Sequence, residues 1–131
     1  KPGGLYITLA PECPNPDAED AISVREDSFY IVESALQSVG FTEFQHWGGN
    51  TISAATWEAV LQWLAGLSVR ISNATSLDDL PELHRNFEDV LKYWSSNLEQ
   101  AKPAICAFIE AFSEWVRKTI SRHDAIVVHG I

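Results

Sequence analysis

The chain lacks methionine altogether and contains only two cysteines among its 131 residues. Cys13 and Cys106 have neither CxxC spacing nor a histidine cluster beside them, so the pattern required for a zinc site or a redox motif is missing. Two free thiols in a reducing cytoplasm suit this spacing better than one long-range disulfide, which is the alternative. The missing methionine is consistent with a processed protein, a trimmed chain or a domain excised from a larger protein, and these alternatives stay open.

Basic side chains are also scarce. Nine Lys and Arg face eighteen Asp and Glu, which gives a net charge of −9. Binding to the nucleic acid backbone needs clustered cations, so this charge argues against a nucleic-acid partner, and it disfavours anionic membranes for the same reason. No apolar run approaches the ~20 residues that span a bilayer, and the first four residues do not resemble a signal peptide. We therefore expect a cytoplasmic protein with no membrane contact.

What the sequence does contain is enough apolar material for one core. The hydrophobic fraction is 46%, with five Trp and six Phe. A chain of this length can hide roughly 65 to 70% of its unfolded surface without disulfides or metals. We therefore predict a single globular domain over residues 1–131, of the α+β class and predominantly helical.

Apolar residues at helical spacing predict about four helices. The first has Glu26 and Asp27 at its N-terminus and stops at Gly40. Three longer helices are expected over residues 53–72, 79–98 and 103–120 and should form an antiparallel bundle. Ser53 is the expected N-cap of the first of these three, Ser76 and Asp79 form a capping pair for the second, and Pro103 should occupy the first position of the third. A strand over residues 69–71 is an alternative to the end of the first long helix.

The remaining β-prone runs predict a small sheet of two or three strands. These runs are the N-terminal residues 5–9, the alternating residues 41–47 and the C-terminal residues 125–131, and residues 22–24 could add a brief extended piece. An isolated terminal strand would be prone to aggregation. We therefore expect the C-terminal strand to pair with one of the other two, so that the sheet packs against the bundle.

None of the patterns associated with catalysis, cofactors or metals is complete. Asp17, Glu19 and Asp20 resemble the start of a calcium loop, but the glycine and glutamate that an EF-hand requires are missing. Cys106 lies within a predicted helix, beside its apolar stripe, where an inert thiol is the usual outcome. In the predicted helix over residues 79–98, the acidic side chains alternate with Arg and Lys, as on a solvated helix face. We predict no catalytic, cofactor-binding or metal site; a small hydrolase-type enzyme stays the least favoured alternative. That enzyme would require a nucleophile to meet the histidines at positions 46, 84, 123 and 129.

A protein-binding surface is the function that these residues favour. Carboxylates concentrate near the N-terminus. Trp47 lies at an expected turn, and Trp63 lies off the apolar stripe of the helix over residues 53–72. Exposed aromatic residues beside acidic ones are typical of interface hot spots. Small acidic inhibitors, such as the immunity proteins of interbacterial toxins, offer an analogy of class only. We expect an inhibitor that occludes the active site of a basic partner; a regulatory domain cut from a larger protein is the alternative. The predicted partner-binding residues are Glu12, Asp17, Glu19, Asp20, Glu26, Asp27, Trp47 and Trp63. A homodimer would also bury the two tryptophans.

Overall fold

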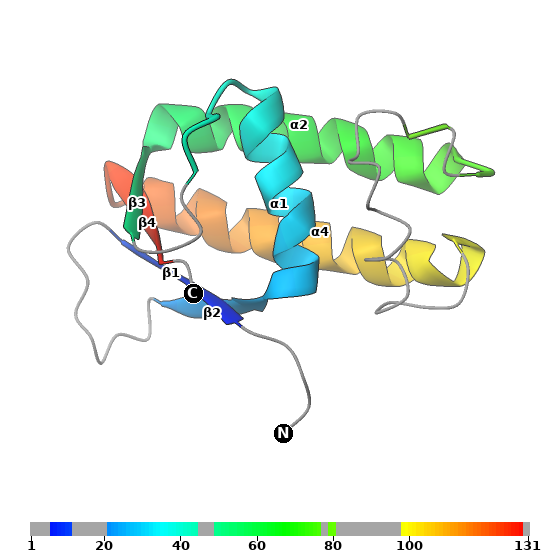
Figure 1. The fold of residues 1–131 in the computed structure, drawn as a ribbon, viewed down its shortest axis with the longest axis horizontal. Helices are drawn as coiled ribbons and strands as arrows, with labels where there is room; N and C mark the ends of the chain where they lie inside the picture. Colours follow the sequence, from blue (N-terminus) through cyan, green and yellow to red (C-terminus); the bar gives the residue numbers. More distant parts are fainter. Residues whose placement is uncertain (1–5, 12–20, 45–48, 77–78, 81–97, 130–131) are drawn as a thin grey trace.

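The computed structural model describes residues 6–11, 21–44, 49–76, 79–80 and 98–129. Within them the chain forms four strands and three helices (Figure 1). In chain order these are β1 (Tyr6–Pro11), β2 (Ile22–Arg25), α1 (Glu26–Ser38), β3 (Gly49–Ser53), α2 (Ala54–Asn73), α4 (Leu98–Ile120) and β4 (Ala125–His129). None of these helices is both long and apolar enough to cross a membrane.

All neighbouring strands of the sheet are antiparallel, in the order β2-β1-β4-β3. The first and last strands of the described chain therefore form its centre, where Thr8 pairs with His129 and Leu9 with Val128. Burial alternates along β3, since Asn50 and Ile52 point inward. The expectation that the two terminal runs meet in one sheet is confirmed.

The long helices α2 and α4 lie side by side and antiparallel, and α1 crosses them (Figure 1). Ser53 ends β3 and also caps α2, because its hydroxyl accepts a hydrogen bond from the Thr56 N–H at 3.3 Å. The predicted start of this helix is confirmed. The helix then continues to Asn73, so the alternative strand over residues 69–71 is wrong.

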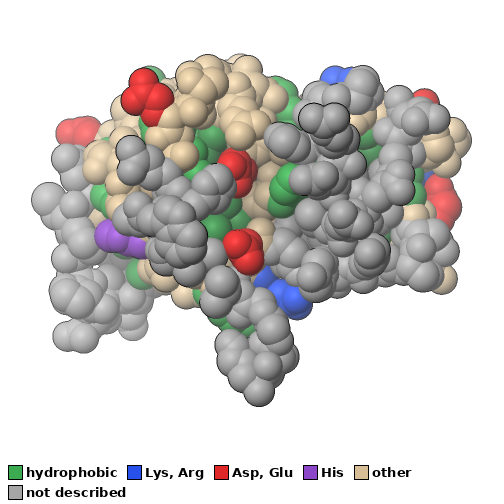
Figure 2. Space-filling view, in the orientation of Figure 1, with side chains coloured by type: hydrophobic (Ala, Val, Ile, Leu, Met, Phe, Trp, Pro, Cys, Tyr) green, Lys and Arg blue, Asp and Glu red, His purple; other side chains and the backbone are tan. Residues whose placement is uncertain are grey.

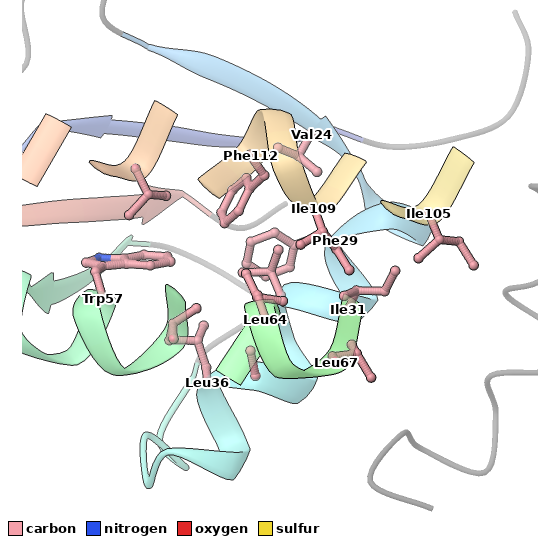
Figure 3. Close-up of a cluster of buried hydrophobic side chains, with 14 of the residues drawn as sticks. Val24, Phe29, Ile31, Leu36, Trp57, Leu64, Leu67, Ile105, Ile109 and Phe112 are labelled. Atoms are coloured by element: carbon pink, nitrogen blue, oxygen red, sulfur yellow. The ribbon is translucent and has the colours of Figure 1, made fainter. Parts of the chain in front are cut away.

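The core lies where the inner sides of the helices meet the sheet (Figure 3). Trp57 on α2 is fully buried and its ring centroid lies 6.2 Å from that of Phe112 on α4. Phe29 and Leu36 reach the same cluster from α1, and Val24 reaches it from β2. Burial of these large side chains is the main favourable contribution to folding.

The predicted sheet of two or three strands is wrong, because the described sheet has four. Residues 22–25 form a full edge strand, paired with β1. Of the strand expected over residues 41–47, residues 41–44 have no regular structure and 45–47 lie outside the described residues. A strand that was not predicted, β3, occupies Gly49–Ser53 and pairs with β4, although its first two residues are of types common in turns. Its Asn50 side-chain amide donates to the Val128 carbonyl at 3.4 Å, so a residue typical of turns is accommodated inside the sheet.

The predicted number of helices and the three-helix bundle are also corrected. The described residues contain three helices, of which only α2 and α4 form a long antiparallel pair. The helix expected over residues 79–98 falls almost entirely outside the described residues. The last helix begins at Leu98, so Pro103 lies inside α4 and not at its first position. The predicted first helix is confirmed, since α1 begins at Glu26 and Gly40, with φ of 101°, follows its end.

Candidate functional site

An open groove of about 790 Å³ runs between α2 and α4, on the side of the pair turned away from the core. A second hollow of about 530 Å³ continues it towards the start of α2 and the end of α4. The two hollows share Leu61, Ala65 and Arg117, so they form one continuous feature. We call this feature the α2–α4 groove. Its α2 side is formed by Glu58, Leu61, Gln62, Ala65, Ser68 and Val69, and its α4 side includes Pro103, Cys106, Ala107, Glu110, Glu114 and Arg117.

Apolar and charged side chains both line the groove. On the α2 wall, Ala65 is exposed and Val69 is 61% exposed, one of the two large hydrophobic side chains that stand out on the described surface. On the α4 wall, Glu110 and Glu114 are exposed one helical turn apart, and Arg117 follows. Among the described residues, neither glutamate forms an ion pair. Among the described residues, the groove therefore combines exposed apolar side chains with an excess of carboxylates over arginine.

At the Pro103 end of the groove, Cys106 is half-buried against the last turns of α2. Its thiol lies 3.7 Å from the Ser72 hydroxyl and donates to the Ser68 carbonyl at 3.8 Å. Lys102 closes the same end, since its ammonium group donates to the Ser72 carbonyl at 3.4 Å and lies 2.7 Å from the Glu99 carboxylate. The partners of the thiol are therefore a serine hydroxyl and a carbonyl.

The structure does not bring Cys106 and the described histidines together. His123 follows the end of α4, and His129 lies in β4 opposite Thr8 and Gly49. The other two histidines, at positions 46 and 84, lie outside the described residues. The arrangement around Cys106 thus offers a packed thiol and no imidazole base among its hydrogen-bond partners.

Most of the predicted partner-binding residues lie outside the described residues. These are Glu12, Asp17, Glu19, Asp20 and Trp47, and the side chain of Asp27 is not described either. Glu26 is exposed as the first residue of α1. Trp63 is half-buried and packs against the core, so much of its ring is already covered within the chain.

The fold nevertheless fixes both ends of residues 12–21, which contain Glu12, Asp17, Glu19 and Asp20 and which we call the acidic segment. The chain leaves the sheet at Pro11, which pairs with Ile126, and it returns at Ile22, which pairs with Leu9. Residues 12–21 therefore connect two adjacent, hydrogen-bonded strands. On the face that carries α1, Figure 2 shows the carboxylates of the described residues in small separate groups.

Beyond the end of α2, one carboxylate has a defined set of partners. Asp79 accepts hydrogen bonds from the Thr75 N–H at 2.9 Å, the Thr75 hydroxyl at 3.1 Å and the Ser76 N–H at 3.3 Å. These bonds, led by that from the Thr75 backbone, lower the pKa of Asp79. The bond from Ser76 to Asp79 is the one expected of a capping pair, whereas the helix that it would cap lies outside the described residues. This motif is structural and does not belong to the groove.

In the part of the chain that the structure describes, no group of three or more His, Cys, Asp or Glu side chains could hold a metal ion. Comparison of the chain with protein-family models, with curated proteins and with solved structures finds no match. The site must therefore be judged from its own chemistry.

Sequence reasoning did not identify the groove. The available signal was a second stripe of small residues on each helix, at Ala65 and Val69 and at Pro103 and Ala107, each pair four residues apart. Such a stripe is weaker than the main apolar stripe of the same helix. It becomes informative only once the two helices are known to be neighbours.

Proposed function

We propose that this chain is a non-enzymatic acidic protein-binding domain of the inhibitor or immunity type, acting in the cytoplasm. It would neutralise a basic toxin or enzyme by covering the active site of that partner. The acidic segment would provide steering and ion pairs through Glu12, Asp17, Glu19 and Asp20. The free thiol of Cys106 is consistent with a reducing compartment.

The observation that carries this proposal is the position of the acidic segment in the fold. One end is held where Pro11 pairs with Ile126 of β4, and the other is held where Ile22 pairs with Leu9 of β1, so the segment joins two strands of the sheet. Binding residues carried by short connections between rigid elements are common, because the scaffold reduces the entropy lost on binding. With a net charge of −9, the domain would also attract a basic partner over some distance. Such steering raises the association rate and weakens as salt screens the charges.

The test compares partner capture by the unchanged chain and by a charge-neutralised variant. The variant D17N/E19Q/D20N removes three carboxylates from the acidic segment. The matched control E33Q/E43Q/E99Q removes three carboxylates from α1, from the segment after it and from α4, and so changes the net charge equally. Each immobilised protein is incubated with lysate of the source organism at low salt, and the retained proteins are identified.

We expect the unchanged chain and the control to retain the same basic protein and D17N/E19Q/D20N to lose most of it. The purified partner should then lose its own activity when the chain is added in equimolar amount. Retention by all three proteins alike would show that the acidic segment is not the binding element. A partner that stays fully active in the complex would rule out the inhibitor function.

A further inference from the structure

The geometry of the α2–α4 groove points to a docking site for a basic amphipathic helix supplied by the partner protein. This inference rests on the proposed function, because it names a second contact surface for the same basic partner. Helix-in-groove docking is a recurrent mode of recognition, in which an apolar stripe enters the groove and flanking charges set the register. The α2–α4 groove contains the components that such docking requires.

The shape of the groove suits a helix. From Pro103 to Ile120 its α4 side would extend for about 26 Å at the ordinary rise of a helix, enough for nearly five turns of a docked helix. The exposed small side chains Ala65 and Ala107 would let another helix approach at the close interaxial distances of packed helices. Val69 and Leu61 would provide the apolar contacts of that approach.

The charges of the groove favour a basic helix. Glu110 and Glu114 are like charges four residues apart on one helix face, a spacing that is unfavourable. Arg117 and Lys118 follow Glu114 by three and four residues, so Glu110 is the carboxylate farther from these cations. No ion pair compensates either of them among the described residues, and Glu58 adds a third carboxylate at the far end. Lys or Arg side chains four residues apart on the docked helix would match Glu110 and Glu114. Arg117 would then select an acidic or neutral residue at the next turn.

The same charges argue against a second copy of this chain as the occupant. Two copies meeting through this groove would bring six lining carboxylates against two lining arginines, since each copy contributes Glu58, Glu110, Glu114 and Arg117. Each copy also carries a net charge of −9. A basic amphipathic helix would provide apolar contacts and also cations for the carboxylates, whereas a second copy would provide apolar contacts but add more carboxylates than cations.

The test uses a defined probe and the complete chain. The probe is a fluorescein-labelled helical peptide of about 18 residues, long enough to fill the groove. Leu and Ala form one of its faces, and lysines four residues apart flank that face. A peptide of the same composition in scrambled order controls for non-specific attraction between opposite charges. Binding is measured by fluorescence anisotropy, and NMR chemical shifts show which residues the peptide contacts.

Two groove variants and two matched controls are compared. A107W fills the groove, whereas A111W places the same side chain at another exposed alanine of α4 that does not line it. E110Q/E114Q removes the paired carboxylates, whereas E43Q/D124N removes two exposed carboxylates elsewhere. Circular dichroism and thermal unfolding confirm that each variant is folded.

We expect A107W to weaken peptide binding by at least about tenfold and E110Q/E114Q by about three- to tenfold, with both controls within about twofold of the unchanged chain. Shift changes should centre on Ala65, Val69 and Ala107. Equal binding of the scrambled peptide, or unchanged binding by A107W, would overturn the inference. The inference would also be overturned if sedimentation showed that the free chain is a dimer and that A107W makes it a monomer. If the chain still captures its partner but the peptide does not bind as expected, only the docking inference is overturned. If the peptide binds but the chain captures no partner, only the proposed inhibitor function is overturned.

Discussion

The inner and outer sides of the α2–α4 pair differ sharply, although the same two helices form both. The inner side carries large, fully buried residues such as Trp57, Leu64 and Ile105. The outer side carries Ala65, Val69 and Ala107, all exposed, together with the carboxylates of the groove. The fold is thus stabilised from one side of the pair, whereas the side chains of the groove are exposed in the described part of the chain. Stability and the proposed binding can therefore be tested by separate substitutions.

The largest effect is expected on the inner side. Trp57→Ala removes a fully buried ring that packs against Phe112, so it should lower the free energy of unfolding by about 3 to 5 kcal/mol. Val69→Ala, on the outer side of the same helix, should change it by no more than about 0.5 kcal/mol. Urea unfolding followed by circular dichroism measures both. Similar losses for the two variants would mean that the two sides do not differ as described.

A proline on the outer side should cost stability. Pro103 lies inside α4, where it cannot donate the backbone hydrogen bond to residue 99, and its ring crowds that carbonyl. Pro103→Ala should therefore raise the free energy of unfolding by about 1 to 2 kcal/mol. This gain is smaller than the ~3 kcal/mol cost of a proline inside a helix, because proline also restricts the unfolded chain. The urea midpoint should rise, while the dependence of the unfolding free energy on urea concentration stays unchanged. A lower urea midpoint would show that the proline ring makes a stabilising contact in the groove.

A smaller gain is expected from the exposed glycine of α2. A Cβ at Gly66 would have no atom within 4 Å, so alanine can be introduced without a clash. Gly66→Ala should raise the free energy of unfolding by about 0.5 to 1 kcal/mol, because glycine loses more backbone entropy in a helix. Gly40→Ala is the control: it also meets no atom, but its φ of 101° should make the substitution destabilising. Thermal midpoints moving in the same direction for both would contradict this explanation.

The elements predicted correctly from the sequence are those whose signal is local. The hydroxyl of Ser53 and the regular apolar stripe that follows it are enough to locate α2, because capping and periodicity depend on neighbours in the sequence. Residues 41–44 show the limit of periodicity, since they alternate but lack a strand partner among the described residues. Gly49 and Asn50, which are typical of a turn, belong to a strand because His129 and Val128 lie beside them. Proline is typical of the first position of a helix, so the sequence predicts a start at Pro103, whereas α4 begins at Leu98 and continues through the proline.

The candidate site was harder to predict than the fold. Acidic residues and tryptophans can be counted in a sequence, but burial cannot, and Trp63 proves to be half-covered by the core. The α2–α4 groove depends on the packing of two helices that are separated in the chain. Small residues such as Ala65 and Ala107 acquire meaning only through that packing.

The smallest effect should appear beyond the end of α2, away from both sides of the helix pair. Hydrogen bonds from Thr75 and Ser76 lower the pKa of Asp79 in the folded chain below its value in the unfolded chain. The stabilisation from this carboxylate is therefore fully present above the unfolded pKa of about 4 and is lost as the pH falls through the folded value. Asp79→Asn should lower the urea midpoint slightly near pH 7, and the difference from the unchanged chain should shrink as the pH falls below the unfolded pKa and disappear below the folded one. A difference that stays constant over this range would mean that the shape of the side chain matters and its charge does not.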